Sequence, residues 1–289
     1  MKKISEILSD GHVHLSCEVF PPKKFENIAQ VSAVAKEIAL LHPSFMSVTY
    51  GASGSTPGHT LAIAQAVNSC GVTPLCHLTC VQSSREHVEK VLSDMQEMGM
   101  QNVLALRGDI PQDGNIREDF KHASDLVAFI HSRGDFCVGA ACYPEGHPEC
   151  GSRAKDMDYL KQKVNMGVDF LTTQMFFDNS LLYNFLFRAE KAGIHVPVCA
   201  GIMPICDGRQ VKRAVQLSGS IMPPRFAAMA DRFGSNPKDM EQAGIAFATE
   251  QIVDLVANGV NNIHLYTMNK PHIARTIMQN LSTIIHTDV

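Results

Sequence analysis

QEMGMQNVLALRGD, at residues 96–109, is the stretch that decides the fold. A polar segment with helical character ends at Gly99, and glycine adopts the left-handed turn after a helix at the least cost. An almost continuously apolar run follows, as expected for a strand that a parallel sheet buries on both faces. The run ends at Arg107-Gly108-Asp109, so charged groups stand where the strand stops.

The same order of helix, glycine and apolar strand recurs along the chain. It is found in NSCGVTPLCHLTC (68–80), HSRGDFCVGAACY (131–143), VNMGVDFLTTQMF (164–176), EKAGIHVPVCAGI (190–202) and VANGVNNIHLYT (256–267). Two earlier segments, LSCEVF (15–20) and FMSVTYGA (45–52), bring the expected number of strands to eight. A repeat of about 26–35 residues fits strand–helix–strand units with right-handed crossovers.

These units predict α/β architecture, as a single (β/α)8 TIM barrel over residues 1–289. The interval between Gly193 and Gly259 is much longer than the others, which predicts extra helices between the seventh helix and the eighth strand. The alternative is an open, doubly wound sheet. That fold normally has a glycine fingerprint after its first strand, where this chain has FPPKKF.

The predicted helices show apolar periodicity. One face of the first is marked by Ile28, Val31, Val34, Ile38 and Leu41. Ser83 and Glu86 have the spacing of a capping box, so we expect Ser83 to begin the third helix.

Composition narrows the class of protein. The chain has 289 residues, 45% of them hydrophobic and 19% charged, with a net charge of −4 and no basic block, which argues against nucleic-acid binding. The nine cysteines form no CxxC pair and are expected to be buried, reduced thiols. No apolar run reaches the roughly 18 residues of a membrane span, and the N-terminus lacks a signal-peptide core. We therefore expect a cytoplasmic protein that does not enter the membrane.

Polar residues interrupt the carboxyl ends of the predicted strands, where TIM barrels carry their active sites. They are Glu18, Thr49, Tyr50, His77, Thr79, Arg107, Asp109, Tyr143, Glu145, His147, Gln174, Tyr266 and Thr267. A single Thr or Tyr there is often a packing or turn residue. A glutamate inside an apolar strand is different, because a buried carboxylate is costly unless it is paired or protonated. Glu18 is therefore the leading candidate for a catalytic residue.

Two further features suit a ligand with ring nitrogens and phosphates. Arg107 and Asp109 can bind a polar heterocycle as donor and acceptor, although a local ion pair is an equal alternative. The segment 141–164 places Arg153, Lys155, Lys161 and Lys163 around the start of a helix. Cations and free amides there suit a pyrophosphate, and the alternative is a solvated basic face.

His12-Val13-His14 resembles the metal-binding pair of barrel hydrolases. Such a pair must lie at the carboxyl end of the first strand to meet ligands from other strands. Here it precedes LSCEVF, so we expect it at the opposite end of the barrel and predict no metal site.

Eight segments in order resemble the methylenetetrahydrofolate reductase family, in its short bacterial form. They are SCEVFPPK (16–23), FMSVTYGASG (45–54), LCHLTC (75–80), NVLALRGDIP (102–111), AACYPEGHPE (140–149), TTQMFFD (172–178), AGIMPI (200–205) and HLYTMN (264–269). Each is weak alone, but together they cover nearly the whole chain in register.

The resemblance implies a FAD-binding barrel that transfers hydride to 5,10-methylenetetrahydrofolate and yields 5-methyltetrahydrofolate in a ping-pong cycle. Glu18 matches the family's catalytic acid, and the chemistry requires an acid with a raised pKa, because a folate ring nitrogen must be protonated before the ring opens. Asp109 would lie between flavin and pterin as a second catalytic group. The flavin would supply the hydride chemistry.

The resemblance also assigns the ligand-binding residues. Flavin contacts would come from Thr49, Tyr50, Ala52, His77, Arg107, Gly108, Asp109, Ala123, Tyr143, His147, Asp156 and Lys163. Folate or the nicotinamide donor would contact Glu18, Gln174, Gln210 and Lys270. The chain departs from the family pattern at Tyr159 and Gln162, which affects the adenine side of FAD, at Ala214, where an aromatic residue is common, and at Lys270, where arginine is common.

The partners implied are methylenetetrahydrofolate and NADH, with NADPH or an electron-donating subunit as other electron sources, and we expect a homo-oligomer. Two other functions stay open. One is a metal-dependent barrel hydrolase that uses His12 and His14, and the other is a folate-binding subunit that carries no flavin and is colourless.

Overall fold

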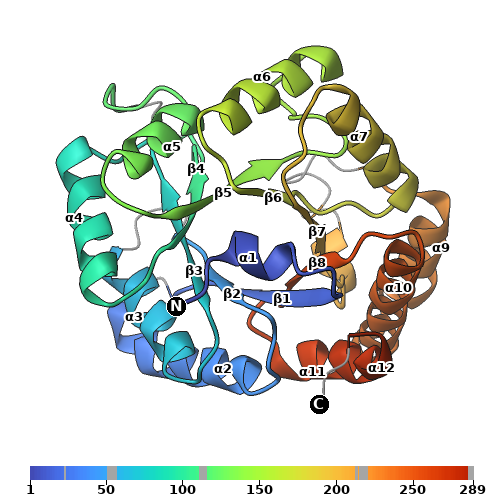
Figure 1. The fold of residues 1–289 in the computed structure, drawn as a ribbon. Helices are drawn as coiled ribbons and strands as arrows, with labels where there is room; N and C mark the ends of the chain where they lie inside the picture. The colour runs from blue at the N-terminus through green and yellow to red at the C-terminus, as the bar shows by residue number, and fades with distance from the viewer. Residues whose placement is uncertain (23, 51–56, 111–115, 212–213, 215–220, 286–289) are drawn as a thin grey trace.

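The structure, a computed structural model, describes residues 1–22, 24–50, 57–110, 116–211, 214 and 221–285. Neighbouring strands pair in parallel in chain order, and β1 also pairs with β8, so the sheet closes into a barrel (Figure 1). The strands are β1 His14–Val19, β2 Met46–Val48, β3 Pro74–Thr79, β4 Asn102–Leu106, β5 Cys137–Cys142, β6 Phe170–Thr173, β7 Val198–Ile202 and β8 Asn262–Tyr266. The predicted (β/α)8 barrel is confirmed, and the open doubly wound sheet is excluded.

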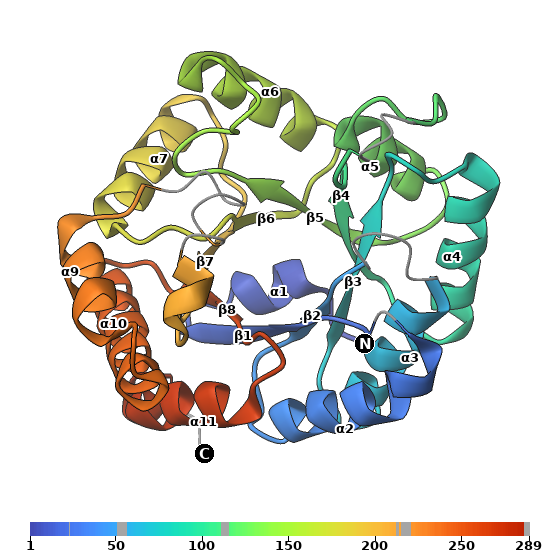
Figure 2. The same cartoon turned by 180° about the vertical axis from the view of Figure 1, so that it is seen from behind.

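Helices surround the strands in both views of the molecule (Figure 1 and Figure 2). They are α2 Ile28–Ala39, α3 Pro57–Asn68, α4 Arg85–Glu97, α5 Ala123–His131, α6 Arg153–Asn165, α7 Asn179–Lys191, α9 Pro224–Phe233, α10 Pro237–Ala257, α11 Pro271–Asn280 and α12 Ser282–Ile285, with a short 3-10 turn η1 at Phe25–Asn27. The short helix α1 Ile4–Leu8 lies instead in the centre of both views. Both α9 and α10 lie between β7 and β8, which confirms the extra helical segment in the long interval after Gly193.

The expected helix ends are largely present. The glycines at 71, 99, 167, 193 and 259 have φ between 70° and 108°, the left-handed turn that the repeat requires, whereas Gly134 is nearly extended at 159°. The expected cap at Ser83 is wrong. Ser84 is the N-cap of α4 and accepts a hydrogen bond from the His87 amide, while the Ser83 hydroxyl donates to the Thr79 carbonyl.

The amino-terminal helix α1 closes the end of the barrel opposite the carboxyl ends of the strands. Its Ile4 and Leu8 are buried in one apolar cluster with Phe45, Leu75 and Phe170 of the strand region. The Asn102 side chain accepts a hydrogen bond from the Ile4 amide at 3.0 Å and donates to the Lys2 carbonyl at 3.2 Å. This floor is apolar and packed, so we expect a ligand to enter from the other end.

Above the floor the interior changes from apolar to polar. Phe45 meets the edge of Phe170, with ring centroids 6.5 Å apart, and stacks on His264 at 5.9 Å. His264 of β8 is 1% exposed and belongs to the next layer, towards the carboxyl ends of the strands, which we call the mouth of the barrel. Layers of inward side chains from alternate strand positions are typical of TIM barrels.

Seven of the nine cysteines are buried and two are partly buried, and all of them are free. This confirms the predicted reduced thiols; burial raises the pKa of Cys17, Cys76 and Cys142 to about 12. Within the described residues, no helix has the length and apolar character needed to cross a membrane.

The floor gives a test of the packing. A Cβ at Gly139 would lie 2.4 Å from Cζ of Phe170, a buried ring, so Gly139→Ala should reduce the free energy of unfolding by about 1–3 kcal/mol. Chemical denaturation followed by circular dichroism measures this. The control is Gly58→Ala in α3, where a Cβ meets nothing within 4 Å. Equal stability of the two variants would contradict the predicted packing at Gly139.

Candidate active site

A cavity of about 310 Å³ opens at the carboxyl ends of the strands. Glu18 from the end of β1, Asp109 after β4 and Gln174 after β6 share its wall. Thr49, Tyr50, His77, Gly108 and Tyr143 line the same cavity. The structure therefore brings together residues that are far apart in the sequence, at the end of the barrel where we expected them.

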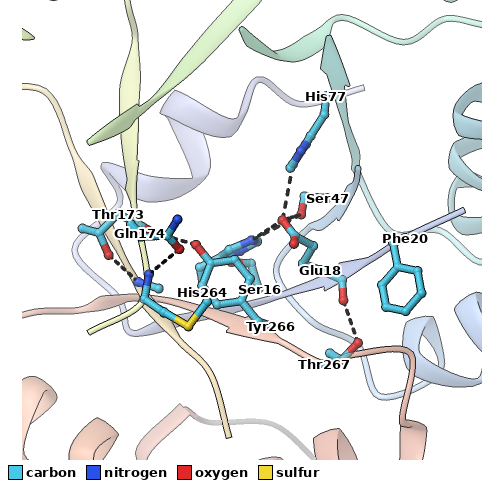
Figure 3. A network of polar contacts seen from close by, with 12 residues as sticks. Ser16, Glu18, Phe20, Ser47, His77, Thr173, Gln174, His264, Tyr266 and Thr267 are labelled. Atoms are coloured by element: carbon cyan, nitrogen blue, oxygen red, sulfur yellow. Dashed lines mark hydrogen bonds and ion pairs between the residues drawn. The ribbon is translucent and has the colours of Figure 1, made fainter. Parts of the chain in front are cut away.

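Glu18 lies at the base of this cavity, with 19% of its side chain exposed. Its Oε2 accepts a hydrogen bond from the Ser47 hydroxyl at 3.1 Å and lies 3.4 Å from Nε2 of His77 and 3.6 Å from Nε2 of His264 (Figure 3). These three side chains come from β2, β3 and β8. The carboxylate is thus held from three directions while one side faces the cavity.

A buried polar layer supports the carboxylate from below. The Ser47 hydroxyl lies 3.2 Å from Nε2 of His264, and Nδ1 of the same ring lies 2.7 Å from the Ser16 hydroxyl. Ser16 in turn donates to the Ile263 carbonyl at 3.0 Å. Ser16, Ser47 and His264 were not among the predicted site residues. The sequence did carry a signal for two of them: Ser16 is two residues from Glu18 in β1, and His264 is two residues from Tyr266 in β8, so each pair lies on one face of its strand.

The protonation of this cluster differs from expectation. Burial by itself would raise the pKa of Glu18, but the contacts with His264, His77 and Ser47 outweigh burial and lower that pKa below its ordinary value. Our expectation of a raised pKa is therefore wrong for Glu18 in this structure. Burial lowers the pKa of His77 to about 4, so its ring is neutral at pH 7.

A second cavity, of about 600 Å³, adjoins the first, and Ala141 and Tyr143 line both. Five predicted flavin-binding residues stand on its wall besides Tyr143, namely Arg107, Ala123, His147, Asp156 and Lys163. Tyr159 and Gln162, the two departures from the family pattern, line it too. Every predicted flavin contact that the structure describes thus lies on one of the two cavities. Ala52 lies outside the described residues.

Arg107 takes a different partner from the one considered. Its guanidinium makes two hydrogen bonds to the Glu149 carboxylate, at 2.6 and 2.8 Å, rather than an ion pair with Asp109. Asp109 is exposed at the rim of the first cavity. Gly108, between them, has φ of 85°, and a Cβ there would lie 2.9 Å from Cβ of Thr79. Glycine is therefore required here by the turn and by Thr79, independently of any ligand.

The basic cluster around α6 divides into two groups. Lys155 and Lys163 line the second cavity, whereas Arg153 donates to the Glu145 carbonyl and Lys161 is exposed outside the cavity wall described by the structure. Lys163 donates to the Ala141 carbonyl at 2.6 Å, and burial lowers its pKa. Two of the four expected cations therefore line the second cavity.

Gln210 and Lys270 are not among the described residues that line either cavity. Gln210 lies in the segment after β7, where its amide donates to the Asp207 carbonyl, and Lys270 precedes α11. Ala214, close to Gln210 in sequence, is buried. The predicted role of Gln210 and Lys270 in substrate binding therefore has no support from a shared cavity and stays a prediction.

His12 and His14 lie at the amino end of β1, as their position before LSCEVF predicted. Nε2 of His14 is 2.7 Å from Asp10, and Nδ1 is 3.1 Å from Ser44, so both ring nitrogens are engaged. Within the described part of the chain, no group of three or more His, Cys, Asp or Glu is arranged to hold a metal ion. The position of His12 and His14 at the amino end of β1, opposite the cavity, argues against the hydrolase alternative.

The low pKa of His77 predicts an acid-sensitive fold. Below pH 6.5 the unfolded chain binds a proton that folded His77, with its pKa of about 4, does not bind, so stability falls as the pH decreases through this range. The titration of His77 alone should reduce the free energy of unfolding by about 2 kcal/mol between pH 7 and pH 5. Urea denaturation of apoprotein at both pH values should show a smaller loss for His77→Gln than for the unaltered protein. Equal losses would contradict the assignment.

Comparison with known proteins agrees with the geometry. A family model described as "Methylenetetrahydrofolate reductase" matches residues 3–282. The 5,10-methylenetetrahydrofolate reductases of Pectobacterium carotovorum subsp. carotovorum and Escherichia coli (strain K12) are 32% and 31% identical over 272 residues, which is 94% of this chain and 91% of each relative. Methylenetetrahydrofolate reductase (NADH) 1 of Zea mays is 35% identical over 98% of this chain, which spans 51% of that longer protein.

Solved structures support the fold independently. A Clostridium thermocellum protein, described as binding two copies of 5-methyl-5,6,7,8-tetrahydrofolic acid, has a TM-score of 0.70 at 12% identity and covers 98% of this chain. At that identity the likeness concerns the fold alone. The family match and the bacterial relatives extend over nearly the whole sequence, and this chain belongs to the methylenetetrahydrofolate reductase family.

Proposed function

We propose that this protein reduces 5,10-methylenetetrahydrofolate to 5-methyltetrahydrofolate with a bound FAD, in a ping-pong cycle with NADH as electron donor. One observation carries the proposal: Glu18, Asp109 and Gln174 share one open cavity that adjoins a second, partly basic cavity. The named relatives support the folate substrate, and the plant relatives that carry NADH in their names support the donor.

The residues present fit an elongated dinucleotide. The second cavity offers Lys155, Lys163 and the start of α6 to a diphosphate, because cations and helix amides bind anions. In the first cavity, Nε2 of His77 is buried without a hydrogen bond of good geometry, so a ring heteroatom of a ligand has a partner there. Tyr143 lines both cavities and would contact the ligand where it passes between them.

When bound, the flavin supplies the hydride. The protein's part in folate reduction is to deliver a proton, since the bridging carbon becomes electrophilic only after one ring nitrogen is protonated and its C–N bond opens. Glu18 is the acid at the base of the cavity, and Ser47 and His264 fix its carboxyl group. A pterin over Glu18 would displace the water that reaches the exposed 19% of its side chain, which raises its pKa towards that of an effective acid.

Asp109 and Gln174 orient the substrate. Both are on the wall of the cavity that contains Glu18, and Asp109 is exposed at its rim. A carboxylate accepts hydrogen bonds from the amino edge of a pterin, and an amide can donate or accept. Contacts from Asp109 and Gln174 would fix the position of the reacting carbon. Such positioning supplies a large part of the rate enhancement in a two-substrate reaction.

The bound cofactor predicts a yellow protein. Purified protein should show the two visible absorption bands of oxidised flavin, and anaerobic NADH should bleach them. NADPH and dithionite are compared in parallel. A colourless protein that does not take up added FAD contradicts the proposal and favours a flavin-free folate-binding subunit. Bleaching by dithionite without bleaching by either nicotinamide would contradict NADH as donor and indicate an electron-donating partner.

The acid role of Glu18 has its own test. Glu18→Gln keeps size and hydrogen bonding but removes the acidic proton, so folate reduction should fall by about 10²–10⁴-fold. The variant should still bind FAD and should still oxidise NADH slowly, because flavin reduction does not need the acid. The control is Glu97→Gln on α4, an exposed carboxylate far from the mouth, which should behave as the unaltered protein. Full folate turnover in Glu18→Gln would refute the assignment.

A further inference from the structure

The turn that follows β8 has an unusual backbone. Met268 and Asn269 are consecutive non-glycine residues with φ of 52° and 54°. The Lys270 amide donates to the Thr267 carbonyl at 3.0 Å, which closes a turn with two left-handed central residues, as in type I′. Side chains with a Cβ adopt this conformation at a cost, asparagine less than methionine. Strained turns of this kind persist where the surroundings hold them, and they often mark functional positions.

Side chains of this turn hold the end of β1. The Thr267 hydroxyl donates to the Glu18 carbonyl at 2.6 Å. The Asn269 side chain makes two hydrogen bonds to Phe20: its Oδ1 accepts from the Phe20 amide at 3.0 Å and its Nδ2 donates to the Phe20 carbonyl at 2.9 Å. An amide side chain that pairs with both groups of one residue imitates a neighbouring strand.

The sequence explains why such a clamp is needed. The β1–β8 pairing ends at Glu18 and Tyr266, so the backbone ladder stops at the catalytic acid. Phe20 is followed by Pro21 and Pro22, which have no amide hydrogen and cannot extend the ladder. Without Asn269 the end of β1 beyond Glu18 would lose this side of its hydrogen bonding.

We propose that Asn269 is a positioning residue for the folate half of the reaction: it fixes the carboxyl end of β1, and so holds the Glu18 carboxylate in register with Ser47 and His264. Thr267 assists from the same turn. These hydrogen bonds from Thr267 and Asn269 to the end of β1 are called the clamp below. Because the turn leads directly into Lys270, the clamp also connects Glu18 to the loop that carries this lysine. The inference rests on the proposed function, since it assigns to Asn269 an effect on the step that needs the acid.

The test uses Asn269→Gly, which keeps the left-handed backbone and removes the amide. Rapid mixing of holoenzyme separates flavin reduction by NADH from flavin reoxidation by methylenetetrahydrofolate. Reoxidation should fall by about 10–100-fold, because a small displacement of a catalytic group is costly. Flavin reduction should change by less than about twofold, since it does not need the acid. The matched control is His42→Gly, at an exposed residue with the same φ of 54° that precedes β2.

The proposal would be overturned if the rates of flavin reduction and reoxidation fell in parallel, as a merely structural role predicts. It would also be overturned if neither rate fell. Asn269→Asp provides a second variant, because it tolerates the left-handed backbone and keeps the acceptor for the Phe20 amide while losing the donor. It should give a smaller loss in reoxidation. A larger loss than in Asn269→Gly would also count against the clamp.

A cofactor-independent readout separates this inference from the proposed function. In apoprotein, an infrared pH titration follows the Glu18 carboxylate, identified by its absence in Glu18→Gln. Loss of the clamp should raise the Glu18 pKa towards its ordinary value of 4.5, since the carboxylate withdraws from the contacts that lower it. An unchanged titration in Asn269→Gly overturns the positioning role. Failure of the unaltered protein to bind flavin or reduce the folate would instead refute the proposed function.

Discussion

A carboxylate inside a closed barrel must be compensated, and the interior of this protein is organised around that requirement. Glu18 occupies the level between an apolar floor and an open mouth, where burial without partners would cost several kcal/mol. Ser47, His77 and His264 face it from three other strands, and Ser16 fixes the far side of the His264 ring. His264 in turn rests flat on Phe45. One polar layer therefore lies between the packed floor and the cavity that Glu18 faces.

The mouth above this layer is shaped by connections rather than by strands. The loops after β4 and β5 and the start of α6 form the second cavity, in which Arg107 is held by Glu149 and Lys163 by the Ala141 carbonyl. The turn after β8 holds the end of β1 through Thr267 and Asn269. The strands thus set the depth of Glu18 in the barrel, and the loops determine which residues lie around the cavity above it. This division is usual in TIM barrels and allows one scaffold to serve many reactions.

The sequence predicted the barrel well, because its signals are local: a glycine that ends a helix and an apolar strand after it. It also predicted which end carries the polar residues, since the carboxyl end of each strand can be located in the sequence. Side-chain pairing was harder. Nothing local distinguishes Ser84 from Ser83 as a cap, or Glu149 from Asp109 as the partner of Arg107, because such choices depend on how loops from different units meet. The support from Ser16, Ser47 and His264 required the register of β1, β2 and β8. The loops that hold Gln210 and Lys270 have no repeat to fix their path.

The most direct measurement is a crystal structure of the protein with FAD and 5-methyltetrahydrofolate. We expect the flavin ring in the first cavity, the diphosphate beside α6 in the second, and the pterin against the flavin, with the Glu18 carboxyl group within hydrogen-bond reach of the folate, directly or through one water. A folate bound elsewhere on the barrel, or a flavin that separates the pterin from Glu18, would contradict the proposed role of Glu18 as the acid.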